Sequence, residues 1–148
     1  MVEGILEAAF PQLRGTAWSI TSPKSECYNC IAWAAGDDTN WWWPDPADPR
    51  AIWPTGARIG QGVANFVSAF ATLGYEVTSE EEAEPGIDRV ALFAAADGTV
   101  AHAARQLSSG AWTSKLGRGE DIEHLLHALE GAEYGRVVQV LRRAATSQ

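Results

Sequence analysis

The spacing of apolar residues predicts four helices in the chain. Three of them repeat apolar positions at intervals of three and four, as a helix with one buried face does, and they cover residues 3–10, 62–73 and 121–129. The fourth is expected where residues 31–35 are apolar without a break, so this helix is buried on most sides. It is expected to begin near Cys30 and to end at Gly36, because glycine readily adopts the left-handed conformation that closes a helix.

An antiparallel meander of three strands is predicted in the second half of the chain. The first strand is nearly all apolar and is therefore expected near the centre of a sheet. The strands and the turns between them are, in order, 89–95, Asp97-Gly98, 99–107, Ser109-Gly110 and 111–116. If the second turn has two residues, Arg105 lies opposite Ser114 on the neighbouring strand.

These elements together predict a single α+β domain over residues 1–148. The N-terminal helices, one of which bears Cys30, are expected to pack on the antiparallel meander. A C-terminal helix or helices should follow, beginning with residues 121–129. The apolar pattern of residues 134–143 fits either a last helix or a strand.

Tryptophan is unusually frequent, with seven in the chain. Four of them lie in a proline-rich stretch that cannot form long regular structure, and these are Trp41, Trp42, Trp43 and Trp53. Long loops inside compact domains are usually functional or disordered, and so many large aromatic side chains argue against disorder. They are expected to form either a lid over the core or one wall of a substrate groove.

Composition and charge narrow the choice of partners and compartment. The formal net charge of −8 disfavours binding to nucleic acids and to anionic membranes. Two cysteines are too few for a disulfide framework, which favours a reducing compartment. The first residues carry acids where a signal peptide needs basic residues, and no apolar run reaches membrane-spanning length. A cytoplasmic location is therefore expected.

Cys30 and His102 are the candidate catalytic pair. Cys30 falls at or near the first turn of its helix, where unpaired backbone amides favour the thiolate. His102 lies near the start of the second strand of the meander, and an imidazole there can take the thiol proton. A third polar residue is needed to orient His102. Asp121 and Ser114 are both candidates, and Asp121 is equally suited to cap a helix.

Other interpretations of these residues stay open. Cys30 also suits a small apolar position in a core helix. Cys27 and Cys30 have the spacing of a redox pair, although no strand precedes them as in thioredoxin-type proteins. The same two cysteines resemble half of a zinc site that His124 and His127 would complete, although these histidines suit a helix surface better. Lys115 is a further candidate nucleophile if it is desolvated.

Two short motifs resemble those of papain-like and NlpC/P60-like cysteine hydrolases. Residues 27–34, Cys-Tyr-Asn-Cys-Ile-Ala-Trp-Ala, are similar to the Cys-x-x-Cys-aromatic signature, with Cys30 at the nucleophile position and Ile31 where an aromatic residue is usual. Residues 100–103, Val-Ala-His-Ala, are similar to the histidine-bearing strand of these enzymes. The resemblance implies a papain-like fold and a thiol nucleophile.

A fuller set of motifs resembles an uncharacterised bacterial domain family. This family has no established activity, so the resemblance implies none for the chain. The set covers most of the chain and consists of YNCIAWA, WWWP, HAARQL, WTSKLG and DIEH. In papain-like enzymes a glutamine donates to the oxyanion, but Lys24 occupies that spacing here. The amide of Cys30 and the side chain of Asn29 are therefore expected to serve instead.

We therefore expect a cysteine hydrolase, of the peptidase, amidase or deamidase type, that acts on a peptide or protein. Cys30 and His102 would carry the chemistry, with Asp121 or Ser114 as the orienting residue. The substrate-binding residues would be Asn29, Trp41, Trp42, Trp43 and Trp53. Neither a cofactor nor a metal is expected. The alternative is a non-catalytic papain-like module that binds a peptide or protein through the tryptophan-rich stretch.

Overall fold

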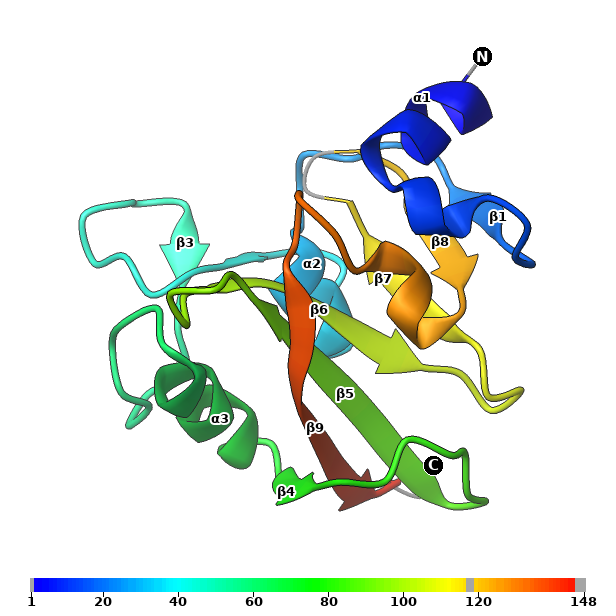
Figure 1. The fold of residues 1–148 in the computed structure, drawn as a ribbon. Helices are drawn as coiled ribbons and strands as arrows, with labels where there is room; N and C mark the ends of the chain where they lie inside the picture. The colour runs from blue at the N-terminus through cyan, green and yellow to red at the C-terminus, as the bar shows by residue number, and fades with distance from the viewer. Residues whose placement is uncertain (1, 117–118, 146–148) are drawn as a thin grey trace.

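The computed structural model describes residues 2–116 and 119–145. Seven strands form an antiparallel sheet in the order β1-β8-β7-β6-β5-β9-β4 (Figure 1). Their bounds are Ser19–Ser22 (β1), Glu76–Thr78 (β4), Ile87–Ala94 (β5), Val100–Gln106 (β6), Trp112–Lys115 (β7), Asp121–His124 (β8) and Arg136–Ala144 (β9). The long strand β5 lies between β6 and β9, as its apolar sequence requires.

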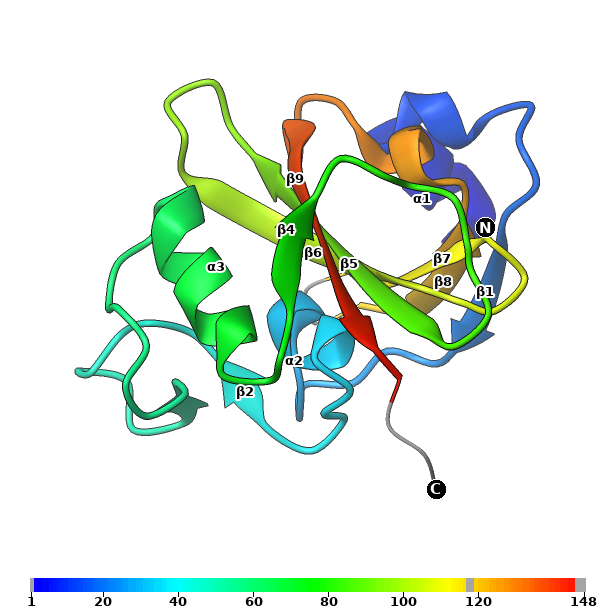
Figure 2. The ribbon, with the colours of Figure 1, turned by 90° about the horizontal axis from the view of Figure 1, so that it is seen from below.

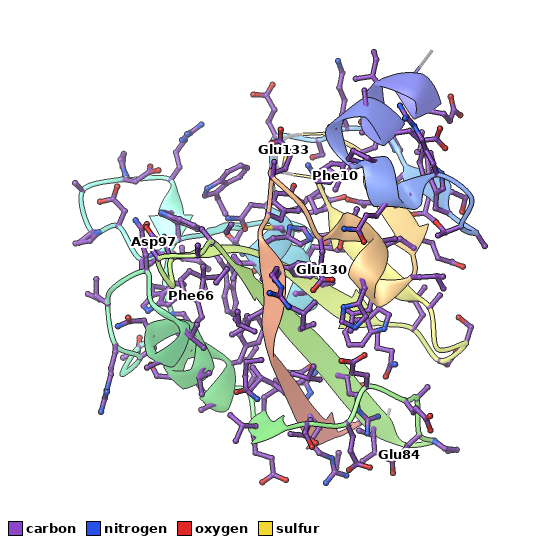
Figure 3. All side chains as sticks on the ribbon, viewed as in Figure 1. Phe10, Phe66, Glu84, Asp97, Glu130 and Glu133 are labelled. Carbon is purple, nitrogen blue, oxygen red and sulfur yellow. The ribbon has the colours of Figure 1, made fainter. Side chains whose placement is uncertain are left out.

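Short helices cover both faces of this sheet (Figure 2). One face carries α2 (Cys30–Ala34) and α3 (Val63–Ala71), and the other carries α1 (Val2–Ala9) with the 3-10 turns η1 (Pro11–Leu13) and η2 (Leu126–Leu129). Leu92 packs in the cluster that contains Phe66, whereas its neighbour Phe93 packs in the cluster that contains Phe10. Figure 3 shows Phe66 beside α3 and Phe10 beside α1. Successive side chains of a strand point to opposite faces, so the sheet divides the core in two.

The tryptophan-rich stretch contains a small parallel sheet of β2 (Trp41–Trp42) and β3 (Ala51–Ile52). Trp43 and Trp53 both meet Phe66 of α3 edge-on, with ring centroids 5.7 and 5.1 Å apart. The stretch is therefore ordered and packed against the face that carries α2 and α3.

Several predicted elements are confirmed. The helices expected over 3–10 and 62–73 appear as α1 and α3, and the three-strand meander appears as β5, β6 and β7. The helix that carries Cys30 is also present, although it has only five residues. Within the described ranges, no helix combines the length and apolar character that a bilayer crossing requires.

The expected α+β, papain-like architecture, with helices on a meander and C-terminal helices, is wrong. The protein is a β-rich fold in which a seven-stranded antiparallel sheet dominates and the helices are few and short. The helix predicted over 121–129 is instead β8 followed by η2, because residues 121–124 pair with the whole length of β7. Residues 136–144 form β9, which lies between β5 and β4. The apolar positions of residues 134–143 fit either period, whereas those of residues 121–129 have helical spacing. In both segments, pairing with neighbouring strands outweighs the local pattern.

Candidate active site

Asn29 fixes the start of α2 and ties it to the tryptophan-rich stretch. Its Oδ1 accepts the backbone N–H groups of Ala32 and Trp42, both at 3.1 Å, and its Nδ2 donates to the carbonyl of Trp42 at 2.7 Å. The side chain is therefore an N-cap, which makes Cys30 the first residue of the helix. The side-chain amide of Asn29, which was expected to donate to an oxyanion, donates to the carbonyl of Trp42 instead.

Cys30 is buried, with 7% of the residue exposed. Burial raises its pKa to about 11, although backbone hydrogen bonds from Ala103, Ile31 and Cys30 itself, and the charge of Lys115, lower it. The thiol is therefore protonated at neutral pH. The three backbone amides and the charge of Lys115 lower the pKa because they stabilise negative charge on the sulfur.

Ala103 of β6 lies beside the Cys30 thiol, in a part of β6 that is not paired with β7. The two strands pair at Arg105 with Thr113 and at Gln106 with Trp112, and this pairing does not extend back to Ala103. The backbone N–H of Ala103 interacts with the sulfur instead. The Cys30 thiol therefore lies beside the strand segment that carries His102.

His102 is fully buried on the opposite side of β6. Its ring stacks on Tyr134, with centroids 4.0 Å apart and planes 5° apart, and meets Phe93 at 5.2 Å. Nε2 lies 2.9 Å from Oγ of Ser114, while Nδ1 is buried and without a hydrogen-bond partner among the described residues. Burial lowers the pKa of His102 well below its ordinary value, and the neighbouring His124 lowers it further. His102 is therefore neutral at pH 7.

Cys30 and His102 thus approach the same segment of β6 from its two sides. Cys30 packs in the cluster that contains Ala103, whereas His102 packs against Phe93 of the other cluster. Among the described residues no hydrogen bond joins the Cys30 sulfur to His102. The two residues are neighbours through the backbone amide of Ala103, and they rest as a neutral thiol and a neutral imidazole.

Of the two candidates for orienting His102, the structure brings Ser114 to it and not Asp121. Asp121 accepts a hydrogen bond from the hydroxyl of Tyr28 at 2.6 Å. Burial raises the pKa of Asp121, although Tyr28 and the charge of Lys115 lower it. Lys115 is itself buried, and its Nζ donates to the carbonyl of Ser25 at 2.7 Å.

A cavity of about 300 Å³ opens beside the thiol and is lined by Asn29, Cys30, Trp41 and Trp43. Two of the predicted tryptophans therefore lie at the site. Trp42 is buried, and its indole N–H donates to Asp37 at 2.9 Å. Trp53 packs on Phe66 and donates to the carbonyl of Arg58 at 3.0 Å. Trp42 and Trp53 hold the stretch in place rather than line the cavity.

The redox and zinc interpretations find little support in the geometry. Cys27 is exposed and Cys30 buried, and both are free thiols. His127 is half-exposed and pairs with Glu81 and Glu130. The described ranges contain no group of three His, Cys, Asp or Glu side chains placed to hold a metal ion.

His124 and Tyr134 are site residues that the sequence analysis missed. His124 was expected on a helix surface, but in β8 it is fully buried, and its Nε2 lies 2.7 Å from Oγ of Ser114. Tyr134 covers the ring of His102. The alternation of Ile122 and His124 on one face of a strand was an available signal for His124, whereas no local pattern points to Tyr134.

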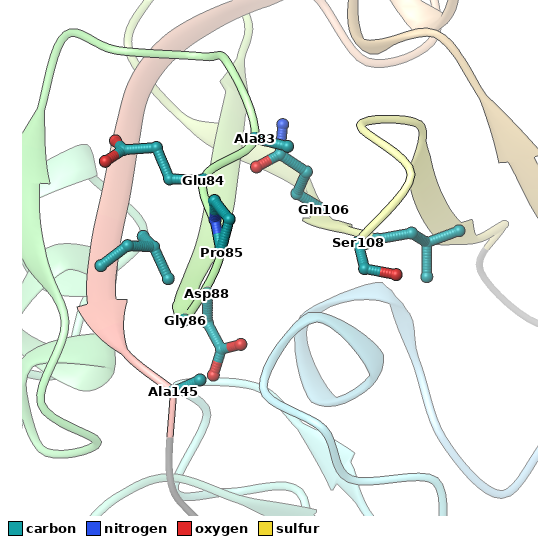
Figure 4. A pocket seen from close by; sticks show the side chains of 10 residues that line it. Ala83, Glu84, Pro85, Gly86, Asp88, Gln106, Ser108 and Ala145 are labelled. Carbon is teal, nitrogen blue, oxygen red and sulfur yellow. The ribbon is translucent and has the colours of Figure 1, made fainter.

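A second cavity, of about 390 Å³, lies between the loop before β5 and the end of β6 (Figure 4). It is lined by Glu84, Asp88, Gln106 and Ser108 among others. Glu84 forms an ion pair with the buried Arg89. Cys30 and His102 do not line this cavity.

The chain belongs to a family described as Domain of unknown function (DUF7689), whose model matches residues 19–142. The match runs from β1 almost to the end of β9, so it includes Cys30, His102, Ser114 and His124. No curated protein and no solved structure matches the chain.

Proposed function

We propose that the protein is a cysteine hydrolase in which Cys30 attacks an amide or related acyl bond and His102 exchanges the proton. One observation carries this proposal. The Cys30 thiol lines an open cavity and contacts the backbone amide beside His102, whose Nδ1 is the buried nitrogen without a partner. A nucleophile at a cavity, and a base carried by the strand segment that contacts this nucleophile, are the two groups that covalent catalysis needs.

The reaction proceeds through a thioester on Cys30. The sulfur attacks the carbonyl carbon, the carbonyl π electrons move to the oxygen, and the thiol proton passes to Nδ1 of His102. The tetrahedral intermediate collapses, and the leaving amine or alcohol takes the proton from Nδ1. Water then attacks the thioester while giving a proton to Nδ1, and that proton returns to the sulfur as the acid is released.

Proton transfer in this scheme accompanies attack and does not precede it. The pKa of Cys30 is raised to about 11 by burial and that of His102 is lowered, so a thiolate–imidazolium pair is disfavoured at rest. The backbone amides of Cys30, Ile31 and Ala103 surround the sulfur and are available for developing negative charge. Hydrogen bonds of a catalytic pair are often long before substrate binds, and this agrees with an unpaired Nδ1.

The test is acylation by p-nitrophenyl acetate, followed by release of p-nitrophenol. The wild-type protein should be acetylated on Cys30, and His102→Ala should slow this by about 100-fold or more, because a general base contributes 10²–10⁴-fold. Cys27→Ala is the matched control and should react like the wild type, since Cys27 is exposed and outside the cavity beside Cys30. Equal rates for wild type and His102→Ala would overturn the proposal, provided that circular dichroism finds both folded.

The neutral resting state also favours a second candidate, a module that binds without turnover. The cavity would then hold an apolar side chain of a peptide or protein between Trp41 and Trp43. The wild type would show no acetylation of Cys30. N-acetyl-leucinamide would quench tryptophan fluorescence on titration, and Trp41→Ala would abolish this change.

A further inference from the structure

A serine hydroxyl joins two buried histidines across three strands. Oγ of Ser114 on β7 lies 2.9 Å from Nε2 of His102 on β6 and 2.7 Å from Nε2 of His124 on β8. All three side chains are fully buried. A hydroxyl has one proton to donate, so the two imidazoles cannot both accept from it. If Nε2 of one ring accepts this proton, Nε2 of the other ring must therefore donate to the serine oxygen.

The carbonyl of Leu125 fixes the proton of His124 on Nδ1. Nδ1 lies 2.7 Å from this oxygen, and a carbonyl only accepts, so Nδ1 carries the hydrogen. The described contacts of the two ring nitrogens are this carbonyl and the Ser114 hydroxyl, and neither is a carboxylate. Burial also lowers the pKa of His124 to about 4. The ring is therefore neutral, and its Nε2 is an acceptor.

The acceptor at Nε2 of His124 determines the positions of the protons on Ser114 and His102. Ser114 donates its hydroxyl hydrogen to Nε2 of His124, and its oxygen is then left to accept from Nε2–H of His102. Since His102 is neutral, its Nδ1 holds a lone pair. The opposite arrangement, with the proton of His102 on Nδ1, would set two bare Nε2 atoms against one hydroxyl and leave one contact without a hydrogen.

We infer that His124, acting through Ser114, is a positioning residue that holds the proton of His102 on Nε2 and keeps Nδ1 free. The tautomer follows from the hydrogen bonds of the two buried, neutral rings, whereas its use, to receive the proton of Cys30, rests on the proposed hydrolase function. Nδ1 is fully buried and has no partner within the described part of the chain, as a base that awaits a proton requires. Ser114 takes the place of the orienting residue of a catalytic triad, and His124 orients Ser114 in turn.

The test of the tautomer is long-range ¹H–¹⁵N NMR of protein labelled with ¹⁵N-histidine. The wild type should show His102 with its proton on Nε2. In His124→Ala the Ser114 hydroxyl is free to donate to His102, so a share of His102 should move to the Nδ1–H form. His124→Gln, whose side-chain oxygen can accept from Ser114, should restore the Nε2–H form. His127→Gln is the matched control and should leave His102 unchanged, because His127 is half-exposed and bound to Glu81.

The result that overturns the inference is a wild-type His102 with its proton on Nδ1, or a His102 tautomer that does not change in His124→Ala. Should His124→Ala fail to fold, Ser114→Ala breaks the same chain and is judged by the same spectrum. Acetylation of Cys30 by p-nitrophenyl acetate gives the second readout. His124→Ala should lower the rate by about 10²–10⁴-fold, and His124→Gln should recover most of it, because an incorrect tautomer removes the base. If the wild type is not acetylated at all, the proposed function fails while the NMR result still decides the tautomer.

Discussion

His124 should make the protein lose stability as the pH falls from 6.5 towards 4. Its imidazole is fully buried, and burial lowers its pKa from 6.5 to about 4, although the bond to the carbonyl of Leu125 opposes this. In the unfolded chain the imidazole keeps a pKa near its ordinary value. Between the two values the unfolded state binds more protons than the folded state, so acid favours unfolding.

The sign and size of the effect follow from these two pKa values. The contribution of His124 to the free energy of unfolding is complete above pH 6.5 and is lost as the pH falls through this window. At about 1.4 kcal/mol for each pH unit, the whole difference amounts to about 3 kcal/mol. His102, whose pKa is also lowered by burial, adds to the loss in the same direction.

Urea unfolding at a series of pH values between about 4 and 7 measures this effect. The free energy of unfolding of the wild type should rise with pH more steeply than that of His124→Gln, by up to about 1.4 kcal/mol per pH unit. His127→Gln is a control of opposite sign. Partial burial lowers the pKa of His127, but contacts with Glu81 and Glu130 outweigh this and raise it, so its loss should steepen the slope. Parallel curves for the wild type and His124→Gln would refute the reasoning.

A buried hydrogen bond, a crowded glycine and the lowered pKa of His102 each have a further measurable consequence. Tyr28→Phe removes a buried hydrogen bond to the carboxylate of Asp121 and should lower the free energy of unfolding in urea by about 1–3 kcal/mol, and an unchanged value would contradict this. Gly135→Ala, at φ +76°, would clash with the backbone of β5 and should destabilise the protein by more than about 1 kcal/mol. Gly4→Ala in α1, with open space around it, should stabilise by about 0.5–1 kcal/mol, and similar effects of the two would count against the structure. Since His102 must be neutral to accept a proton, the acid limb of kcat/KM for p-nitrophenyl acetate should lie below pH 6.5, and a limb at or above 6.5 would argue against its role.

The local elements of this fold could be predicted from the sequence better than their assembly. The helical spacing of α3 and the apolar run of β5 are strong signals, because each depends on residues close together in the chain. The strand character of β8 and β9 is decided by pairing with strands that lie elsewhere in the sequence. Local periodicity carries no information on such partners, and this is why C-terminal helices were expected.

A single residue in a turn determines which side chain reaches His102. A two-residue turn at Ser109-Gly110 predicts Arg105 opposite Ser114, and this prediction is wrong. The loop has three residues, closed by the hydrogen bonds between Leu107 and Ala111 and between Gly110 and Leu107, so Arg105 lies opposite Thr113. A shift of one residue turns every side chain of a strand to the other face, and here it brings Ser114 to the face of His102.

The choice between Ser114 and Asp121 therefore depended on register, which the sequence left open. Asp121 has the more usual chemistry for orienting a histidine, but the register of β8 puts it opposite Lys115. There it meets Tyr28 instead of His102. Cys30 and His102 were predictable as candidates because their residue types and their elements are both local features.

The most direct test of the account is to locate the acyl group after reaction with p-nitrophenyl acetate. Peptide mass spectrometry of the folded protein should find acetate on Cys30, bound as a thioester that hydroxylamine removes. The adduct should be retained in Cys27→Ala and greatly reduced in His102→Ala. Acetate confined to the exposed Cys27, or an adduct on Cys30 that forms equally well without His102, would contradict the account.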